Sequence, residues 1–280
     1  MAREAGLMLV CGRKGVGKTH TTLEVIEEYV NGNKRTGAPP RRVLILDVND
    51  EFTKYKAIDL RDIKDWCRYG RVEIRRVRIW HTYGDNVGKK MTLNEIADAL
   101  QIILDNYNRG MLLIEDINKY ISDSVPGDLI GSICTQRHVA VDIVAHFQGI
   151  GRIGHPKLWS NANWVRMHRT DDNVERHKNK FAGYERPLKI AESLINLKFR
   201  EGNAHFYCYF NKDTGQIFGG GFTRNDFFKA VETYLSENYN TEVKPYLNKK
   251  NISTGGNMFN NHTEGVDSLR MEIFKEYYGN

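Results

Sequence analysis

The sequence predicts an α/β fold, a mostly parallel sheet with helices on both faces. Between residues 7 and 147, short apolar runs typical of buried strands alternate with segments that carry a helical apolar stripe. That alternation is the pattern of parallel strands joined by crossover helices. A glycine-rich loop follows the first apolar run, and polar residues follow later ones, at the strand ends where such sheets bind ligands.

The first strand is predicted at residues 7–11 and leads directly into a glycine-rich octapeptide. The octapeptide is Gly12-Arg13-Lys14-Gly15-Val16-Gly17-Lys18-Thr19, which fits the phosphate-binding pattern G-x-x-x-x-G-K-[ST]. In such a loop, backbone N–H groups surround the phosphates, the lysine reaches the β- and γ-phosphates, and the threonine hydroxyl ligates Mg²⁺. We therefore expect these eight residues and the following His20 to bind a nucleoside triphosphate, with Thr19 on the metal.

A helix is predicted from Lys18 to about Tyr29, followed by a turn-rich, basic stretch at 31–42. Residues 43–46 are expected to form a strand buried on both faces, ending in Asp47. A further strand is predicted at 72–80. The run RVEIRRVR at 71–78 suggests that this strand has one basic face, and a solvated face is preferred to a binding surface. Residues 81–90 are predicted to be a loop.

Thr92 is predicted to begin a helix because Glu95, three residues later, completes a capping box. The next strands are expected at 111–114 and 139–147, with a short helix at 129–133 between them. Farther on, a hairpin is predicted around 213–215 and a helix at 224–235. We expect an ATPase domain at 1–240, with a core at about 6–170 and an extension at 171–240. A flexible tail with a short terminal helix is expected at 241–280.

Glu115 and Asp116 follow the strand at 111–114, and Gln148 follows the strand at 139–147. A carboxylate at such a strand end holds Mg²⁺, and its neighbour orients the attacking water. By position, Glu115 takes the metal and Asp116 the water, although the two roles could be exchanged. Gln148 is predicted to sense the γ-phosphate or to position water; a structural hydrogen bond is its alternative role.

Whole-chain properties exclude several classes of protein. The 280 residues carry a net charge of +6, a mild hint of a polyanionic partner. No apolar run approaches the about 18 residues of a membrane span, so we expect a soluble, cytoplasmic protein. The four cysteines show no spacing typical of a zinc site or a disulfide framework, and they are Cys11, Cys67, Cys134 and Cys208.

Other nucleotide enzymes are disfavoured. The guanine-reading pattern N-K-x-D is absent, since Asn211-Lys212-Asp213 places its aspartate one residue too early. No D-x-x-G follows the second or third predicted strand. The arginine-rich lid usual in small-molecule kinases is also not evident. ATP is therefore the expected nucleotide.

Several segments, in order, resemble the FtsK/HerA superfamily of P-loop ATPases. That superfamily includes the genome-packaging ATPases of tailless viruses and the Zot-like assembly proteins of filamentous phages. After the octapeptide, residues 44–52 (LILDVNDEF) are similar to the D-P-H-G-E-Y segment of HerA-type translocases. The acidic strand end follows, and residues 136–148 resemble the R-H…D-h-h-h-x-x-Q segment. Residues 161–163 are similar to the N-A strand start. The resemblance covers roughly residues 6–170.

The departures from the family pattern are the reversed acidic pair and Asn49-Asp50 in place of His-Gly. The resemblance implies a RecA-like core in a homo-oligomeric ring, a hexamer, that threads double-stranded DNA through its centre. It also implies an arginine finger from the neighbouring subunit. Arg137 matches its position, Arg152 is the second candidate, and a surface arginine is the alternative role for Arg137. Loops 84–90 and 34–42 are the candidate DNA contacts.

The predicted function is an ATP-hydrolysing DNA translocase with Mg²⁺ as cofactor, in the form of a viral genome-packaging motor. The resemblance adds a capsid vertex or portal component as a partner, and the host cytoplasm or the virion as the location. One alternative is a Zot-like virion-assembly ATPase, a role that normally needs a membrane span. The other is a nucleotide-binding scaffold with little turnover, which the reversed acidic pair leaves open.

Overall fold

A computed structural model describes residues 5–120, 127–153, 155–181, 183–250 and 256–279. The chain divides into two compact units, Met1–Val165 and Arg166–Asn280. Among the described helices, none is both long and apolar enough to cross a lipid bilayer.

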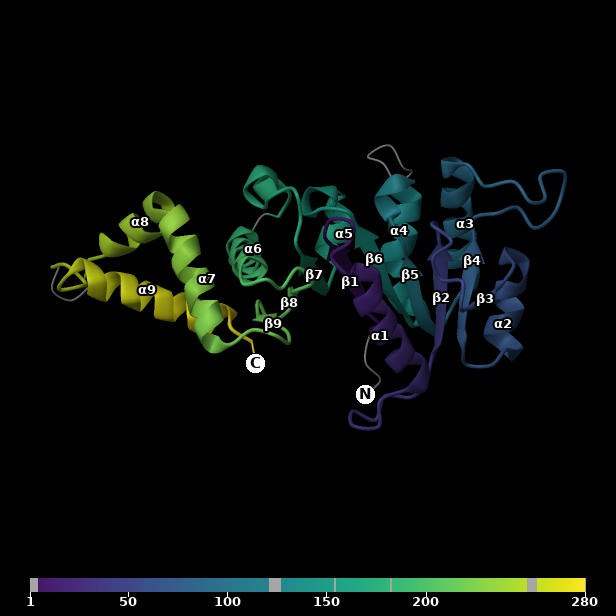
Figure 1. Cartoon of the computed structure of the whole chain (residues 1–280), viewed down its shortest axis with the longest axis horizontal. Coiled ribbons are helices and arrows are strands. Elements are labelled where there is room, and N and C mark those ends of the chain that lie inside the picture. The colour runs from purple at the N-terminus through teal and green to yellow at the C-terminus, as the bar shows by residue number, and fades with distance from the viewer. Residues whose placement is uncertain (1–4, 121–126, 154, 182, 251–255, 280) are drawn as a thin grey trace. The chain divides into compact units, whose positions relative to one another are not determined.

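The first unit is built on parallel strands (Figure 1). They lie in the order β3-β4-β2-β5-β6-β1. Their bounds are β1 (Leu7–Cys11), β2 (Arg42–Asp47), β3 (Lys56–Ala57), β4 (Ile74–Arg78), β5 (Gly110–Ile114) and β6 (Val141–Phe147). The predicted α/β class with a mostly parallel sheet is therefore confirmed. Because all these strands run the same way, their carboxyl ends meet at one edge of the sheet.

Helices connect these strands as crossovers. They are α1 (Lys18–Asn31), α2 (Ile63–Tyr69), α3 (Leu93–Asn106) and α4 (Gly127–Thr135), and α5 (Pro156–Asn161) follows β6. The step from β1 to β2 runs across the sheet in one direction, whereas those from β4 to β5 and from β5 to β6 run in the other. Right-handed crossovers therefore place α1 on one face and α3 and α4 on the opposite face.

The core beneath α1 follows the twofold alternation of the strands. Ile26 of α1 packs on a fully enclosed cluster that also holds Val10, Val43, Ile45, Phe52, Met111, Leu113 and Val144. Their strand neighbours Leu44, Leu112 and Ile143 point to the other face and are also buried. Strands buried on both faces need continuous apolar runs, which explains the sequences of β2, β5 and β6.

The predicted start of α3 is confirmed. The Thr92 hydroxyl accepts a hydrogen bond from the Glu95 N–H at 3.3 Å, and the Thr92 N–H donates to Glu95 Oε2 at 2.7 Å. These reciprocal bonds satisfy backbone groups that a helix start otherwise leaves open. Short 3₁₀ turns lie between the elements, at Leu60–Asp62, Ile117–Lys119, Gln136–Val139, Ile150–Arg152 and Glu175–Lys180.

The second unit is mostly helical. Its elements are α6 (Glu185–Arg200), β8 (Tyr207–Asn211), β9 (Ile217–Phe218), α7 (Arg224–Glu237), a π-turn at Tyr239–Val243, α8 (Lys244–Leu247) and α9 (His262–Tyr277), while β7 (Trp164–His168) crosses the unit boundary. β8 and β9 form the predicted antiparallel hairpin, with Tyr209 opposite Phe218. The region predicted as a tail contains α9, whose Ile273 and Phe274 are buried. Phe274 packs edge-on against Phe227 of α7, with ring centroids 5.8 Å apart.

Candidate nucleotide-binding site

The octapeptide forms an open loop between β1 and α1. Gly15 and Gly17 adopt left-handed backbone angles, with φ of 81° and 88°, which residues other than glycine rarely adopt. The Gly12 N–H donates to the Phe147 carbonyl at 3.3 Å and so fixes the start of the loop to β6. Val16 is buried, whereas Lys14 and His20 are exposed and Arg13 is half-buried. The loop is thus anchored at its base and exposed at its tip.

The lysine of the motif folds back over the loop. Lys18 Nζ donates to the Gly12 carbonyl at 2.6 Å and to the Arg13 carbonyl at 2.8 Å. No side chain caps the start of α1, and its first turn holds no acidic residue. The N–H groups and positive dipole end of α1 are therefore offered to an anion, as phosphate-binding helices offer them. These features fit the triphosphate that the motif predicts.

Glu115 meets the threonine of the motif. The Thr19 hydroxyl donates to Glu115 Oε1 at 3.2 Å, joining the loop to the end of β5. A hydroxyl and a carboxylate at this spacing are the oxygen donors that Mg²⁺ takes in P-loop proteins, with phosphate oxygens and water completing its shell. The two residues therefore fit the predicted metal site, with Glu115 rather than Asp116 on the threonine.

The Glu115 carboxyl holds its proton unusually strongly. The residue is only 3% exposed, and burial raises its pKa to about 8, with Glu51, Asp116 and Asp47 adding negative charge around it. The Thr19 hydroxyl works against this by stabilising the carboxylate. A divalent cation placed here would compensate the charges that raise the pKa.

Asp116 is held in a different way. Its backbone is left-handed, with φ of 44°. Its Oδ1 accepts from Gln148 Nε2 at 3.2 Å, while its Oδ2 accepts from Asn49 Nδ2 at 3.0 Å and pairs with Lys119 Nζ at 2.7 Å. Burial alone would raise the pKa of Asp116, but these donors outweigh it and hold that pKa below its ordinary value. Both oxygens are therefore engaged by protein groups.

The side chain of Gln148 faces the acidic pair. Its amide donates to Asp116, and its backbone N–H donates to Asn118 Oδ1 at 3.3 Å. The loops after β5 and β6 are thereby joined beside the phosphate loop. Sensing of the γ-phosphate by Gln148 stays a prediction.

Asp47 serves the turn that follows β2. Its carboxylate accepts from the Glu51 and Phe52 N–H groups at 2.9 and 3.1 Å, and it pairs with Arg76 of β4 at 2.7 Å. Asp47 is fully buried, so this pairing compensates the cost of placing its charge in the core. Asp47 therefore fixes the turn. Its neighbours Asn49 and Glu51 act on the site, Asn49 through hydrogen bonds and Glu51 through its charge.

Asp50 explains one departure from the family pattern. Its φ is 58°, a left-handed angle, at the position where the resembling D-P-H-G-E-Y segment has glycine. Aspartate tolerates this region better than most residues. Here its carboxylate is also bound by Arg76 and by Arg78, whose Nε lies 3.2 Å from Asp50 Oδ1. The replacement keeps the turn and adds ion pairs to β4.

The fold is shared with solved structures of the genome-packaging NTPase B204 from Sulfolobus turreted icosahedral virus 2. Its complex with ATPγS aligns with a TM-score of 0.52 at 15% identity, over 76% of this chain and 95% of that chain. The AMP complex gives a TM-score of 0.50 at 15% identity, over 78% and 98%. The chain has the fold of a viral genome-packaging NTPase. The predicted resemblance to packaging ATPases is thus confirmed at the level of fold.

Other comparisons add less. The N-terminal domain of zonular occludens toxin from Neisseria meningitidis aligns with a TM-score of 0.34 at 13% identity, over 60% of this chain and 79% of that chain, too low to establish a common fold. No protein-family model matches the sequence, and no curated protein does. Membership of the FtsK/HerA superfamily therefore stays a prediction.

Some residues of the candidate nucleotide site have no signal in the sequence. Lys119 donates to Asn49 Oδ1 at 2.7 Å and pairs with Asp116, although no motif marks it. The Thr22 hydroxyl donates to the Lys18 carbonyl at 2.9 Å and lies 2.8 Å from His146 Nε2. This buried pair ties α1 to β6 beside the loop.

The two arginine-finger candidates lie at opposite edges of the parallel sheet. Arg137 is in the 3₁₀ turn Gln136–Val139, which precedes the amino end of β6. The phosphate loop follows the carboxyl end of β1, which is parallel to β6. The length of β6, roughly 23 Å at about 3.3 Å per residue, separates Arg137 from its own loop. Arg152, in the turn Ile150–Arg152, follows the carboxyl end of β6.

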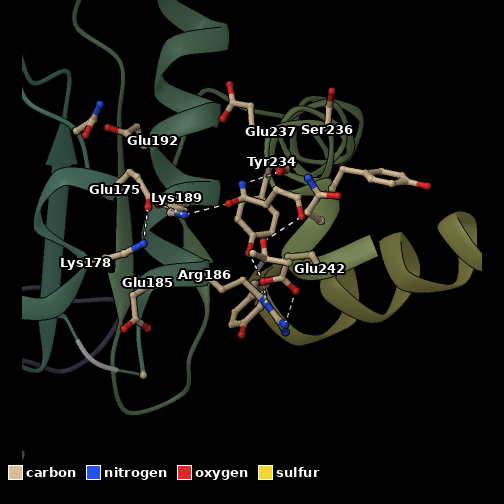
Figure 2. Close-up of a pocket in the computed structure, with 17 residues that line it drawn as sticks. Glu175, Lys178, Glu185, Arg186, Lys189, Glu192, Tyr234, Ser236, Glu237 and Glu242 are labelled. Carbon is tan, nitrogen blue, oxygen red and sulfur yellow. Dashed lines mark hydrogen bonds and ion pairs between the residues drawn. The ribbon is translucent and has the colours of Figure 1, made fainter. Parts of the chain in front are cut away.

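The second unit contains a groove of about 940 Å³ (Figure 2). Its cations are engaged by carboxylates of the same groove. Arg186 pairs with Glu242 at 2.7 Å, and Lys178 pairs with Glu175 at 2.6 Å, while Lys189 binds the other oxygen of Glu175. None of the nucleotide-site residues lines this groove. An anionic ligand would have to displace these internal pairs, so the groove is not a second phosphate site.

Proposed function

We propose that the chain is an ATP-hydrolysing motor that moves DNA during viral genome packaging, and that it acts as a homo-oligomeric ring. The observation that carries this proposal is the contact between Thr19 and Glu115 beside the Lys18 ammonium, on a fold shared with a genome-packaging NTPase. The motif supplies the phosphate ligands, and the end of β5 supplies the carboxylate that the metal needs.

Each residue has a proposed role. Thr19 and, through water, Glu115 would hold Mg²⁺, which would supply positive charge beside the phosphates. Lys18 would move from the loop carbonyls to the β- and γ-phosphates, a small shift for a flexible side chain. Gln148 and Asp116 together would position the attacking water. The exposed Glu51, whose charge acts on Glu115, is an alternative group for that task.

A ring is part of the proposal because Arg137, the predicted arginine finger, does not lie beside the phosphate loop of its own subunit. Arg137 lies at the far edge of the sheet from the phosphate loop. If it is the finger, it must reach a site on a neighbouring subunit. A trans-acting arginine would then make hydrolysis depend on assembly.

A second candidate function is a nucleotide-binding scaffold with little turnover. It is favoured by the engaged state of Asp116, whose two oxygens are bound by Gln148, Asn49 and Lys119. A carboxylate held in this way, with a lowered pKa, is a weak base for water. Such a scaffold would change its assembly on binding ATP and would be indifferent to DNA.

The deciding experiment measures ATPase rate with and without double-stranded DNA, together with particle mass in ATP. For the motor, we expect DNA to stimulate turnover and ATP to increase the mass. Lys18→Ala should lower the rate by about 10²-fold or more, since it removes a charged group from the phosphates. Lys64→Ala, which removes an exposed lysine of α2, is the matched control. A Lys18→Ala protein as active as the wild type would refute the motor.

A further inference from the structure

Residues 79–91 form a hairpin on the carboxyl end of β4, visible in Figure 1 as the long blue excursion before α3. Its arms are joined by backbone contacts: Met91 N–H to Ile79 O at 2.9 Å, a bridge between Trp80 and Lys90, and His81 N–H to Lys89 O at 2.9 Å. At the tip, the Val87 N–H donates to Gly84 O at 3.3 Å. The segment predicted to be a loop is therefore an ordered hairpin.

The hairpin presents an aromatic ring and two cations to solvent. Tyr83 is 50% exposed and Val87 is 60% exposed. Lys89 and Lys90 are exposed as well, and Asp85 is the one acidic residue between 81 and 91. The Arg61 guanidinium lies 4.1 Å from the centre of the Tyr83 ring and supports it from one side. Exposed lysines, and a tyrosine hydroxyl whose ring is held in place, are suited to contacts with the phosphates of a nucleic acid.

The base of the hairpin is attached to the turn after β2. Arg78, the last residue of β4, binds Asp50 through two nitrogens, at 3.2 and 3.3 Å. The same guanidinium lies 5.9 Å from the centre of the Trp80 ring, at the start of the hairpin. A displacement of the hairpin therefore acts on Asp50 through a charged, two-point contact.

That turn reaches the acidic pair through the next residue. Asn49 Nδ2 donates to Asp116 Oδ2 at 3.0 Å and lies 3.4 Å from Glu115 Oε2. Asp50 and Asn49 are adjacent in a turn that Asp47 holds by two backbone hydrogen bonds. A continuous set of contacts thus leads from Trp80 through Arg78, Asp50 and Asn49 to Glu115 and Asp116.

The other basic loop has no such attachment. Residues 32–41 join the carboxyl end of α1 to the amino end of β2, so they lie at the edge opposite the phosphate loop. Lys34 and Arg35 are exposed there. The two loops therefore share a basic character and differ in their place relative to the site.

We propose that the hairpin 79–91 contacts the backbone of double-stranded DNA and that Asp50 transmits its position to Glu115 and Asp116. This inference rests on the proposed motor function and assigns it a surface and a route. DNA on Tyr83, Lys89 and Lys90 moves the base of the hairpin. Arg78 moves Asp50 with it, and Asn49 shifts its hydrogen bonds on the acidic pair. Asp50 is a positioning residue, because it does not touch nucleotide.

The surface is tested by salt dependence of DNA binding, which requires no hydrolysis. A labelled duplex is titrated with protein and a non-hydrolysable ATP analogue between 50 and 200 mM salt. For Lys89→Ala/Lys90→Ala, we expect the slope of log K against log salt to fall by about two, roughly one for each lost phosphate contact. Lys64→Ala/Arg68→Ala, which removes two exposed cations of α2, is the matched control and should keep the wild-type slope. Equal slopes for the hairpin variant and the wild type overturn the proposal. The proposal is also overturned if the hairpin variant loses only its ability to form oligomers, because the hairpin would then be a contact between subunits.

The route is tested with Asp50→Asn, which keeps the size of the side chain and tolerates a left-handed backbone. The readout is the ratio of ATPase rate with DNA to the rate without it. We expect DNA affinity to stay within twofold of wild type while this ratio falls to about one. Asp50→Gly, also compatible with positive φ, guards against misfolding of the first variant. A wild-type ratio in either folded variant overturns the route. A wild type without any ATPase activity refutes the motor instead, and leaves the salt-slope test standing.

Discussion

Glu115 and Asp116 are adjacent carboxylates with opposite shifts in pKa. Glu115 is buried among other acids and its pKa rises to about 8, whereas Asp116 is bound by three donors and its pKa falls. The difference arises from partners that come from three separate loops. It divides the pair into a carboxyl that needs a cation and a carboxylate that already has one, Lys119.

The first prediction concerns stability of the nucleotide-free protein against pH. Unfolded, the Glu115 carboxyl titrates near its ordinary pKa of 4.5, and folded near 8. Between these values the folded state binds the extra proton, so this group lowers stability as pH rises. Glu115→Gln removes the effect. The free energy of unfolding of this variant, relative to that of the wild type, should rise from near zero at pH 4.5 to a plateau above pH 8. The rise should be at most about 1.4 kcal/mol for each pH unit.

Urea unfolding in magnesium-free buffer, repeated across that pH range, measures this difference. Asp116→Asn is the control with the opposite sign. Because the pKa of Asp116 is lowered in the fold, its carboxylate stabilises the folded state at pH values above the pKa of the unfolded chain, and this stabilisation is lost as pH falls. A Glu115→Gln difference that stays constant with pH would contradict the burial of an uncompensated carboxyl.

Sequence motifs predict residues that act through a fixed local spacing. Gly12 to Thr19 belong to that class. Glu115 could be paired with Thr19 because β5 and β1, the strands before them, run parallel on either side of β6 and end at the same edge of the sheet. Asn49 and Lys119 could not be predicted, since they meet only when the loops after β2 and β5 fold together. The left-handed backbone of Asp50 could likewise not be predicted, because aspartate in a turn does not indicate a positive φ as glycine does.

At the scale of elements, strands and helices with strong local signals were predicted well. The runs of β2, β5 and β6 are apolar because both sides are covered, and the capping box marked α3. The strand β3 has two residues and no pattern of its own. The helix α6 did carry a signal, with Leu188, Ala191 and Ile195 on its buried side, but it was not predicted. The expected solvated basic face of β4 fails at Arg76, which is 8% exposed because Asp47 and Asp50 bind it.

The second prediction tests the start of α3. Thr92→Ala removes the acceptor for the Glu95 N–H and should destabilise the protein by about 1 kcal/mol. Thr92→Ser keeps the hydroxyl and should cost much less. Denaturant unfolding at pH 7 measures both. Equal losses in the two variants would mean that the threonine methyl, and not the cap, stabilises this helix start.

At the scale of the whole molecule, strand direction decides which residues can act within one subunit. Parallel strands bring Thr19, Glu115, Asn49 and Gln148 together at their carboxyl ends. The same geometry carries Arg137 to the opposite edge. The sequence places the order of strands and loops correctly, but spatial strand order, which makes β2 the neighbour of β5, follows from long-range pairing and not from local pattern.

The third prediction concerns hydrolysis shared between subunits. Arg137→Ala and Glu115→Ala should each abolish most turnover alone. If Arg137 acts on a neighbour, an equal mixture recovers activity, because about a quarter of interfaces then combine an intact Glu115 with an intact arginine. ATPase rate over a range of mixing ratios checks this. The same mixture made with Arg152→Ala is the parallel test. Recovery with Arg152→Ala, and none with Arg137→Ala, would move the finger to the carboxyl edge.

The turn after β2 is held from behind, by Asp47 and the arginines of β4, and not by the side chains that face the site. We therefore expect the turn to keep its backbone when Asn49 is substituted. Such a turn can keep its backbone while the ATPase rate, the response of that rate to DNA or the nucleotide preference changes. Substitutions at position 49 are therefore a way to alter the hydrogen bonds of the acidic pair while the turn keeps its backbone.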